Sequence, residues 1–330
     1  MTGTTSDLDR DGPSGPSRTP LRHKTWRTAL RRGLIPLAAI LPTLIAFAVL
    51  MGYPFLKLLW ISVQKYDYLA LISHRSVWAG LDNYVDVLTR QVPGVSDLPT
   101  VVFRTTAFML ACVFCTILFG TLLALLMERI NKWLRLMLTS AMVLAWAIPA
   151  LTGSVLFQWL FDSKLGVVNW AISSVGVFGN YQNHDWFATG PATFAICTLL
   201  IVWQALPFVA LSVYAGLLVV PKDLSEAARV DGATERDIFW HIQLPSLRGL
   251  FMMLIFLSVI WDFKVFTQLY AMGHGGPDGQ TVTLAIYTYV EGIAEGQYGY
   301  AAAASVVMMM LLLLVLLPYV RNMVNSQEDL

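Results

Sequence analysis

The sequence contains few charged residues and few cysteines. Of its 330 residues, 13% are Asp, Glu, Lys or Arg, and only three are cysteine. A soluble domain has about 25% charged residues, so this chain cannot cover a water-facing surface with charge. Three cysteines do not make a disulfide scaffold, and a formal net charge of +1 gives no reason to expect nucleic-acid binding. These shortages argue against the soluble two-domain enzyme that the length alone would suggest.

Apolar residues are abundant instead, at 56% of the chain, and the mean hydropathy is +0.62. A membrane helix needs about 20 mostly apolar residues, and six stretches are long enough and nearly free of charge. We therefore predict an all-α, polytopic membrane protein with six transmembrane helices. The predicted spans are residues 33–57, 105–127, 136–161, 191–218, 249–272 and 300–320. The shorter apolar stretch 165–178 is predicted to be an interfacial helix.

Six spans place both ends of the chain on one side of the membrane, and the distribution of Lys and Arg indicates which side. Fifteen of these residues lie in the N-terminal tail, the loops after the second and fourth spans, and the C-terminus, against four in the opposite loops. Both termini are therefore expected in the cytoplasm. We predict that residues 1–32 form a disordered segment and then a basic tail on anionic membrane lipid. Residues 33–322 would form the membrane domain, and 323–330 a cytoplasmic tail.

The predicted cytoplasmic loop at residues 221–248 has the pattern of two short helices. In the first, Asp223 is followed three residues later by Glu226, the spacing of a capping box. Gly232 suits the sharp turn that leaves this helix, because glycine readily adopts a positive φ. The sequence therefore predicts a capped helix followed by a tight turn.

The second helix of this loop is also expected to be capped. Thr234 precedes Asp237 by three residues, which again fits a capping box. Leu244-Pro245 is expected to end the helix before the membrane resumes. An ordinary interhelical loop is the simpler interpretation, but two capped helices favour a docking element on the cytoplasmic face.

Specific residues in this loop match a family pattern: Glu226, Ala227, Ala228, Asp231, Gly232, Ala233, Phe239, Ile242, Leu244, Pro245 and Leu247. They resemble the EAA loop of permease subunits of binding-protein-dependent ABC importers, in particular the carbohydrate-uptake branch. Weaker matches are the segments 80–84, 275–277 with Thr281, and 298–305, so that the resemblance extends over roughly residues 35–322. From here on, residues 221–248 are called the EAA loop.

The resemblance implies a type I ABC importer permease fold in a bacterial cell membrane. It implies that two permease subunits form the pore, that two ATPase subunits dock below, and that an extracellular or periplasmic solute-binding protein delivers a sugar. By this analogy the segment 226–232 is a coupling helix seated in a groove of the ATPase. The same resemblance gives the other matched residues, from Ala233 to Pro245, a part in coupling. An oligosaccharide is the expected substrate, with a sugar phosphate or a polyol as alternatives.

Sequence motifs for independent chemistry are missing. The nearest approach to a phosphate-binding G-x4-G-K-[ST] loop is HGGPDGQT at 274–281, which lacks the first Gly and has Gln280 in place of Lys. Cys112 and Cys115 lie in an apolar span with no second pair and no nearby His, so we interpret them as buried thiols. We therefore predict that the chain is not an enzyme and binds no cofactor or metal. ATP and Mg would belong to the partner ATPase.

Polar residues inside the predicted spans are candidates for the substrate path, because such groups are costly in lipid unless they face a cavity or another helix. They are mixed with aromatic residues, as sugar binding requires: Gln158, Trp203, Gln204, Trp261, Asp262, Lys264, Gln268 and Tyr270. The alternatives are interhelical hydrogen bonding and interfacial aromatic belts. A self-sufficient secondary carrier is the competing transporter class, and one charged pair, Asp262 with Lys264, gives it little support.

Overall fold

The computed structural model describes residues 40–89, 97–175, 179–273 and 275–328, with side chains described as far as residue 321. The predicted tail 1–32 and the start of the first span at 33–39 lie outside this range. The chain divides into two compact units, residues 1–56 and 57–330. The described part of the first unit is helical from Ile40 and includes a π-helical turn, Ala48–Gly52. It leads into α2 (Tyr53–Ser62), which crosses into the second unit.

Four described helices are long and apolar enough to cross a membrane. One covers Ile40–Ser62, and the others are α5 (Leu98–Arg129), α9 (Gly190–Leu217) and α16, which runs from Tyr298 to Glu328. Helix α9 matches its predicted span closely. The helix that covers the described part of the first predicted span continues past residue 57 to Ser62, and α16 continues into the predicted C-terminal tail. Helix α5 extends past both ends of its predicted span, because a helix can continue beyond the hydrocarbon where polar residues meet water.

The third and fifth predicted spans are broken helices. The third consists of α6 (Lys132–Trp146) and α7 (Ala150–Leu160), which meet at 103°. Pro149 lies at this break, and the residue before a proline is disfavoured in a helix. The fifth consists of α13 (Arg248–Phe263) and α14 (Thr267–Gly273). Two bent helix pairs pass the test of length and composition for a span: Lys132–Trp146 with Ala150–Leu160, and Glu235–Ser246 with Arg248–Phe263. If each of these pairs counts as one span, up to six of the described helices or pairs are suited to cross a membrane.

Shorter elements join these helices. They are β1 (Gln64–Lys65), α3 (Tyr68–Ser73), β2 (Val77–Trp78), α4 (Asp82–Thr89), α8 (Val167–Val175), a 3-10 turn (Pro277–Gly279), α15 (Leu284–Tyr289) and a π turn (Val290–Ala294). The two strands pair antiparallel, with Gln64 opposite Trp78. Helix α8 occupies the stretch predicted as an interfacial helix. The structure is thus helical apart from one short ladder among the described residues.

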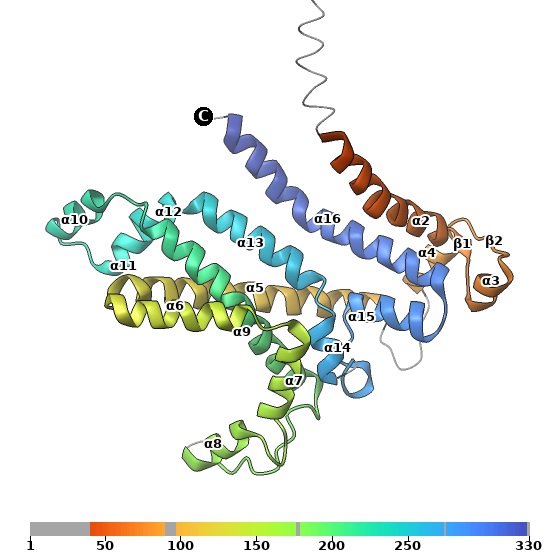
Figure 1. The fold of residues 1–330 in the computed structure, drawn as a ribbon, viewed down its shortest axis with the longest axis horizontal. Coiled ribbons are helices and arrows are strands. Elements are labelled where there is room, and N and C mark those ends of the chain that lie inside the picture. The colour runs from red at the N-terminus through yellow and green to blue at the C-terminus, as the bar shows by residue number, and fades with distance from the viewer. Residues whose placement is uncertain (1–39, 90–96, 176–178, 274, 329–330) are drawn as a thin grey trace, which may run out of the picture. The chain divides into compact units, whose positions relative to one another are not determined.

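The core of the second unit lies where α5 packs along α9, with α13 beside them (Figure 1). Large apolar side chains from several elements meet there, including Phe108 of α5, Leu200 of α9 and Phe263 of α13. Near the EAA loop a second cluster joins Val213 of α9 to Leu254 of α13. Burying apolar surface stabilises a fold by about 25 cal/mol per Å², so these contacts hold α5, α9 and α13 together.

Two of the weaker sequence matches, the segments 80–84 and 298–305, lie together at the start of α16. The Asn83 side chain donates hydrogen bonds of 2.8 Å to the carbonyls of Ser62 and Gln64. The Gly299 N–H donates to the Tyr66 carbonyl at 2.8 Å, and a Cβ atom on Gly299 would lie 2.2 Å from the Gln64 carbonyl oxygen. These segments therefore attach the chain after α2 to the start of α16.

Candidate coupling loop and translocation cavity

The first helix of the EAA loop, α10 (Lys222–Val230), is almost fully exposed. Its one buried side chain is Ser225, while the apolar Leu224 and Val230 are 52% and 89% exposed. The predicted capping box at its start is wrong. Pro221 is the N-cap residue, with no side-chain hydrogen bond, so Asp223 lies within the first turn. There its negative charge is favoured by the helix dipole.

The turn after α10 has the predicted geometry. Gly232 has φ = +86°, a conformation that a residue with a Cβ atom rarely adopts. The N–H groups of Gly232 and Ala233 donate to the carbonyls of Arg229 and Ala228, at 3.1 and 2.9 Å. These bonds satisfy carbonyls at the helix end and reverse the chain direction.

The second helix, α11 (Glu235–Ile238), has the predicted capping box. Asp237 N–H donates to the Thr234 hydroxyl, and Thr234 N–H donates to the Asp237 carboxylate at 3.0 Å. Hydrogen bonds from Thr234 lower the pKa of Asp237. The loop continues through a π turn, Phe239–Gln243, into α12 (Leu244–Ser246).

The helical segment ends next to Leu244-Pro245, within one residue of the predicted end. The helix runs on to Ser246, and a 76° bend follows before α13. Pro245 lies in the first turn of α12, directly after the π turn. Proline is tolerated in a first helical turn, where its missing N–H and fixed φ are least costly.

The ten predicted coupling residues separate into two groups. Glu226, Ala227, Asp231, Gly232 and Pro245 are exposed, and Ala228 and Ala233 are half-buried. The remaining three, Phe239, Ile242 and Leu244, are half-buried as well. Of these, Ile242 and Leu244 pack against the cluster that contains Val213 and Leu254. The loop therefore presents α10 outward, while the segment from Phe239 to Leu244 attaches it to the bundle.

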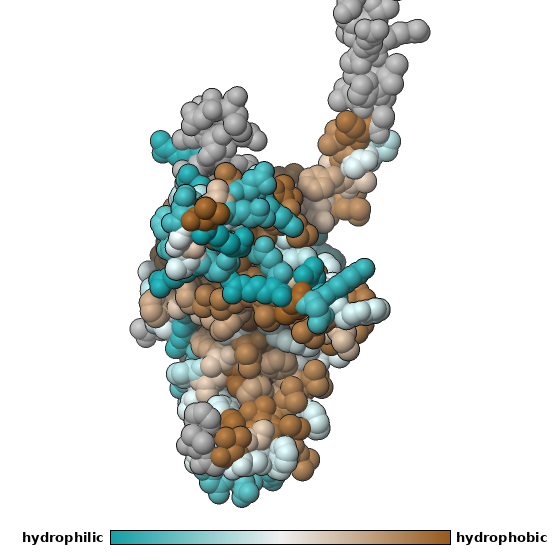
Figure 2. Space-filling view, turned by 90° about the vertical axis from the view of Figure 1, so that its left-hand side faces the viewer, coloured by the Kyte–Doolittle hydropathy of each residue, from teal (hydrophilic) through white to brown (hydrophobic). Residues whose placement is uncertain are grey.

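The exposed part of the EAA loop forms a polar face. Figure 2 views the molecule from the side on which α10 and α11 lie in Figure 1, and polar residues gather there while apolar surface extends below. This contrast matches the charged residues of the loop and the apolar helices of the bundle.

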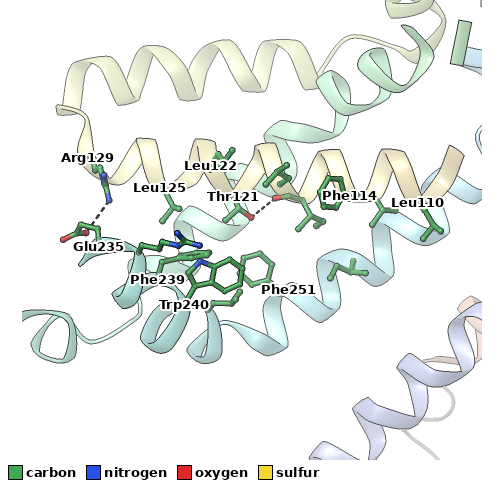
Figure 3. A pocket seen from close by; sticks show the side chains of 16 residues that line it. Leu110, Phe114, Thr121, Leu122, Leu125, Arg129, Glu235, Phe239, Trp240 and Phe251 are labelled. Atoms are coloured by element: carbon green, nitrogen blue, oxygen red, sulfur yellow. Dashed lines mark hydrogen bonds and ion pairs between the residues drawn. The ribbon is translucent and has the colours of Figure 1, made fainter. Parts of the chain in front are cut away.

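An apolar groove of about 800 Å³ lies between α5, the EAA loop and α13. Figure 3 shows that Phe114, Leu122 and Leu125 of α5 face Phe239 and Trp240 of the loop across this groove. Arg129 and Glu235, joined by a dashed line in the figure, lie at one end of it. The loop thus meets α5 through both apolar and charged side chains.

A second cavity, of about 410 Å³, lies at the break between α13 and α14. Five of the eight candidate substrate-path residues line it: Gln204, Trp261, Asp262, Lys264 and Gln268. The Gln268 amide donates to the Gln204 side-chain oxygen at 3.1 Å. The cavity combines aromatic faces with hydrogen-bonding groups, which is the composition that sugar binding requires.

Asp262 and Lys264 line the same cavity, although they are two residues apart. On a continuous helix a spacing of two would place them on different faces, but α13 ends at Phe263, between the two residues. Asp262 is 6% exposed, whereas Lys264 is exposed. No salt bridge within 4.0 Å joins either residue to another part of the chain that the structure describes.

The other three candidate residues lie outside this cavity. The Gln158 amide donates to the Ala271 carbonyl at 2.8 Å, a hydrogen bond between α7 and α14. Trp203 of α9 packs against Phe157 of α7 with ring centroids 5.6 Å apart, and Tyr270 of α14 meets Tyr289 of α15 edge to face with ring centroids 5.0 Å apart. These contacts fit the alternative role of interhelical packing.

Sequence reasoning missed two features of these sites. Trp146 lines the cavity at the end of α6, and Pro149 was the signal for the break that exposes it. The ion pairs of Glu235 with Arg129 and Arg229 join residues up to 106 positions apart. Such pairing depends on the tertiary arrangement and left no local signal.

The chain matches a family model described as a binding-protein-dependent transport system inner membrane component, over residues 117–326. It is 37% identical to the diacetylchitobiose uptake system permease protein DasB of Streptomyces coelicolor, covering 92% of this chain and 91% of that protein. It is 29% identical to the trehalose/maltose transport system permease protein MalF of Thermococcus litoralis, covering 80% and 85% respectively.

A solved structure has the same fold. A chain of a bacterial ABC transporter that imports the acidic polysaccharide alginate aligns with a TM-score of 0.71 at 19% identity, covering 90% of this chain and 97% of that one. The protein is a multi-pass membrane protein of the transport-permease class. The chain belongs to the binding-protein-dependent transport system inner membrane component family, which confirms the resemblance carried by the EAA loop.

Proposed function

We propose that this chain is the permease subunit of an ATP-driven oligosaccharide importer, with α10 as the helix that docks on the ATPase. The observation that carries the coupling assignment is the exposure of α10. Leu224 and Val230 leave apolar surface uncovered on a helix whose other exposed residues are mostly polar. Exposed apolar residues on a polar element fit a helix-in-groove contact with a partner protein. The half-buried Phe239 to Leu244 segment would carry the movement of α10 into the bundle.

The proposed partners are a second permease subunit, two ATPase subunits and a solute-binding protein. A related solved structure is titled as an alginate ABC transporter in complex with an alginate pentasaccharide-bound periplasmic protein. ATP and Mg are assigned to the ATPase subunits, and this chain supplies half of the translocation path. The surrounding membrane lipid contacts the apolar outer faces of the spans.

An oligosaccharide is the substrate that the relatives favour. Their names refer to diacetylchitobiose and to trehalose or maltose. The cavity at the α13–α14 break supports this assignment, because Trp261 offers an aromatic face while Gln204 and Gln268 offer amides. A relative in Yersinia pestis, at 29% identity, is named for sn-glycerol-3-phosphate transport, which keeps a phosphorylated substrate as the second candidate. The exposed Lys264 in the cavity would suit such an anion.

The substrate is identified by measuring what the partner binding protein binds. Calorimetry with maltose, trehalose, diacetylchitobiose and sn-glycerol-3-phosphate separates the two candidates. The complex of both permeases and the ATPase is then reconstituted in liposomes with the same binding protein. The proposal predicts ATP hydrolysis and uptake that both depend on the liganded binding protein. Uptake without ATP would favour a secondary carrier instead.

We propose that the protein lies in a bacterial cell membrane with both termini in the cytoplasm. In a variant without native cysteines, single cysteines at Ser73 and Gln182 should react with an impermeant thiol reagent in intact cells. A cysteine at Lys222 should react only after permeabilisation. Ser225 is unsuitable as the cytoplasmic probe because it is buried, whereas Lys222 is exposed. Labelling of a cysteine at Lys222 in intact cells would indicate the opposite orientation.

A further inference from the structure

The carboxylate of Glu235 bonds to arginines from two different helices. Glu235, the first residue of α11, accepts from Arg229 Nε at 2.8 Å and from Arg229 Nη2 at 3.5 Å. The same carboxylate accepts from Arg129 Nη2 at 3.4 Å (Figure 3). The hydrogen bonds from Arg229 lower the pKa of Glu235, so the carboxylate is ionised at neutral pH.

These two bonds connect the exposed helix to the bundle. Arg229 lies in the last turn of α10, so its bond to Glu235 closes the hairpin formed by α10, the Gly232 turn and α11. Arg129 is the last residue of α5, the helix that packs along α9 through the core. Helix α10 has only one buried side chain of its own, Ser225. The Glu235 carboxylate is therefore a direct side-chain connection from the hairpin to α5.

The exposure of these groups favours a link between two moving helices over a contact that stabilises the fold. The side chains of Arg129, Arg229 and Glu235 are 63%, 50% and 51% exposed. Solvent-exposed ion pairs contribute little to stability, because water and salt screen them. They can form and break at small cost while still transmitting the position of one helix to another. Two further acidic residues, Glu128 and Glu226, also act electrostatically on Arg229.

We propose that Glu235 is a positioning residue that links α10 to α5 through Arg229 and Arg129, so that movement of the docking helix reaches the core helix pair. The inference rests on the proposed coupling function of α10. It goes beyond the matched family residues, which include neither Glu235 nor the two arginines. Glu235 does not touch substrate; it acts by linking the position of α10 to that of α5.

The test is a double-mutant cycle on the complete transporter in liposomes. The variants are Glu235→Ala, Arg129→Ala, the double variant and the conservative Arg129→Lys. Arg236→Ala is the matched control, because Arg236 is the neighbouring exposed cation and forms no salt bridge with a described residue. The measured quantities are ATPase retained on purification, ATP hydrolysis stimulated by the binding protein, and uptake of radiolabelled maltose, trehalose or diacetylchitobiose, whichever the binding protein binds.

We expect Glu235→Ala to lower the sugar transported per ATP hydrolysed by about five-fold or more, with the ATPase still attached. Arg129→Ala should lower this ratio similarly, and the double variant should lower it no further. Arg129→Lys and Arg236→Ala should keep the wild-type ratio. A wild-type ratio in Glu235→Ala overturns the inference, as does a loss explained entirely by detached ATPase. Additive losses in the double variant overturn the route through Arg129. If the wild-type complex itself shows no hydrolysis stimulated by the binding protein, the proposed function fails rather than this inference alone.

Discussion

Helix α10 and the cavity at the α13–α14 break both carry polar residues, but in opposite surroundings. On α10 nearly every side chain faces water, and Arg229 pairs with Glu235 at 2.8 Å. At the break, Asp262 is 6% exposed and forms no salt bridge with a described residue. An exposed charge costs little and is available to a partner, whereas a buried carboxyl is costly unless a ligand or a neighbour compensates it. This difference is what we expect if, as proposed, the first region docks on a partner protein and the second lines the path of a solute.

The largest expected effect is that of Gly232→Val. A β-branched residue at φ = +86° costs about 1–3 kcal/mol of strain, so the turn after α10 should distort and transport should be lost. Gly249→Ala is the control, because Gly249 lies in a helix with open space around its Cβ position. Uptake and co-purification of the ATPase are measured together with the amount of permease in membranes. A Gly232→Val permease that keeps its ATPase and normal sugar-stimulated hydrolysis would contradict the assignment of α10.

The cavity is tested by Asp262→Ala and Gln268→Ala. Both should lower uptake by about ten-fold while the complex stays assembled, a loss equivalent to about 1.4 kcal/mol of binding to the passing solute. Because Gln268 donates to Gln204, the pair Gln204→Ala and Gln268→Ala should give a non-additive loss. Gln158→Ala is the contrasting variant, since Gln158 bonds to a backbone carbonyl outside the cavity lining. Normal uptake in both cavity variants would indicate that these residues serve only in packing between helices.

Two further variants separate structural residues from both functional regions. Gly299→Ala places a Cβ atom 2.2 Å from the Gln64 carbonyl oxygen, so the backbone must shift. Asn83→Ala removes two hydrogen bonds and leaves buried carbonyls without their donor, at a cost of about 1–3 kcal/mol. Both should lower the melting temperature of the purified complex. The sugar transported per ATP should stay unchanged in the molecules that fold. A changed ratio would indicate that the contact between the chain after α2 and the start of α16 takes part in coupling.

The smallest effect concerns the caps of the EAA loop. Thr234→Ala removes the observed capping box and should weaken α11 by about 0.5–2 kcal/mol, seen as faster amide hydrogen exchange at residues 235–238. Asp223→Ala should weaken α10 less than this, because Asp223 is not the N-cap residue and favours the helix only through its dipole. An equal increase in exchange at the start of α11 in Thr234→Ala and at the start of α10 in Asp223→Ala would contradict the difference between the two caps.

The sequence alone predicted the class of protein and the parts of the site that depend on local patterns. Long apolar stretches with few charges require helices in a membrane, because the backbone must satisfy its own hydrogen bonds there. Thr234 with Asp237 predicted a capping box, and Gly232 predicted a turn with positive φ; both are confirmed. The EAA loop pattern predicted the family, which is also confirmed.

Tertiary structure decided which of these residues act together. The break after Phe263 brings Asp262 and Lys264 to one cavity, whereas a continuous helix would separate them. Pro221 rather than Asp223 is the N-cap residue of α10, so this helix begins at Lys222, earlier than the local pattern predicted. Glu235 meets Arg129 only because α11 folds back against the end of α5. Local patterns determine helices, caps and turns, while contacts between residues far apart in the chain depend on how the helices pack.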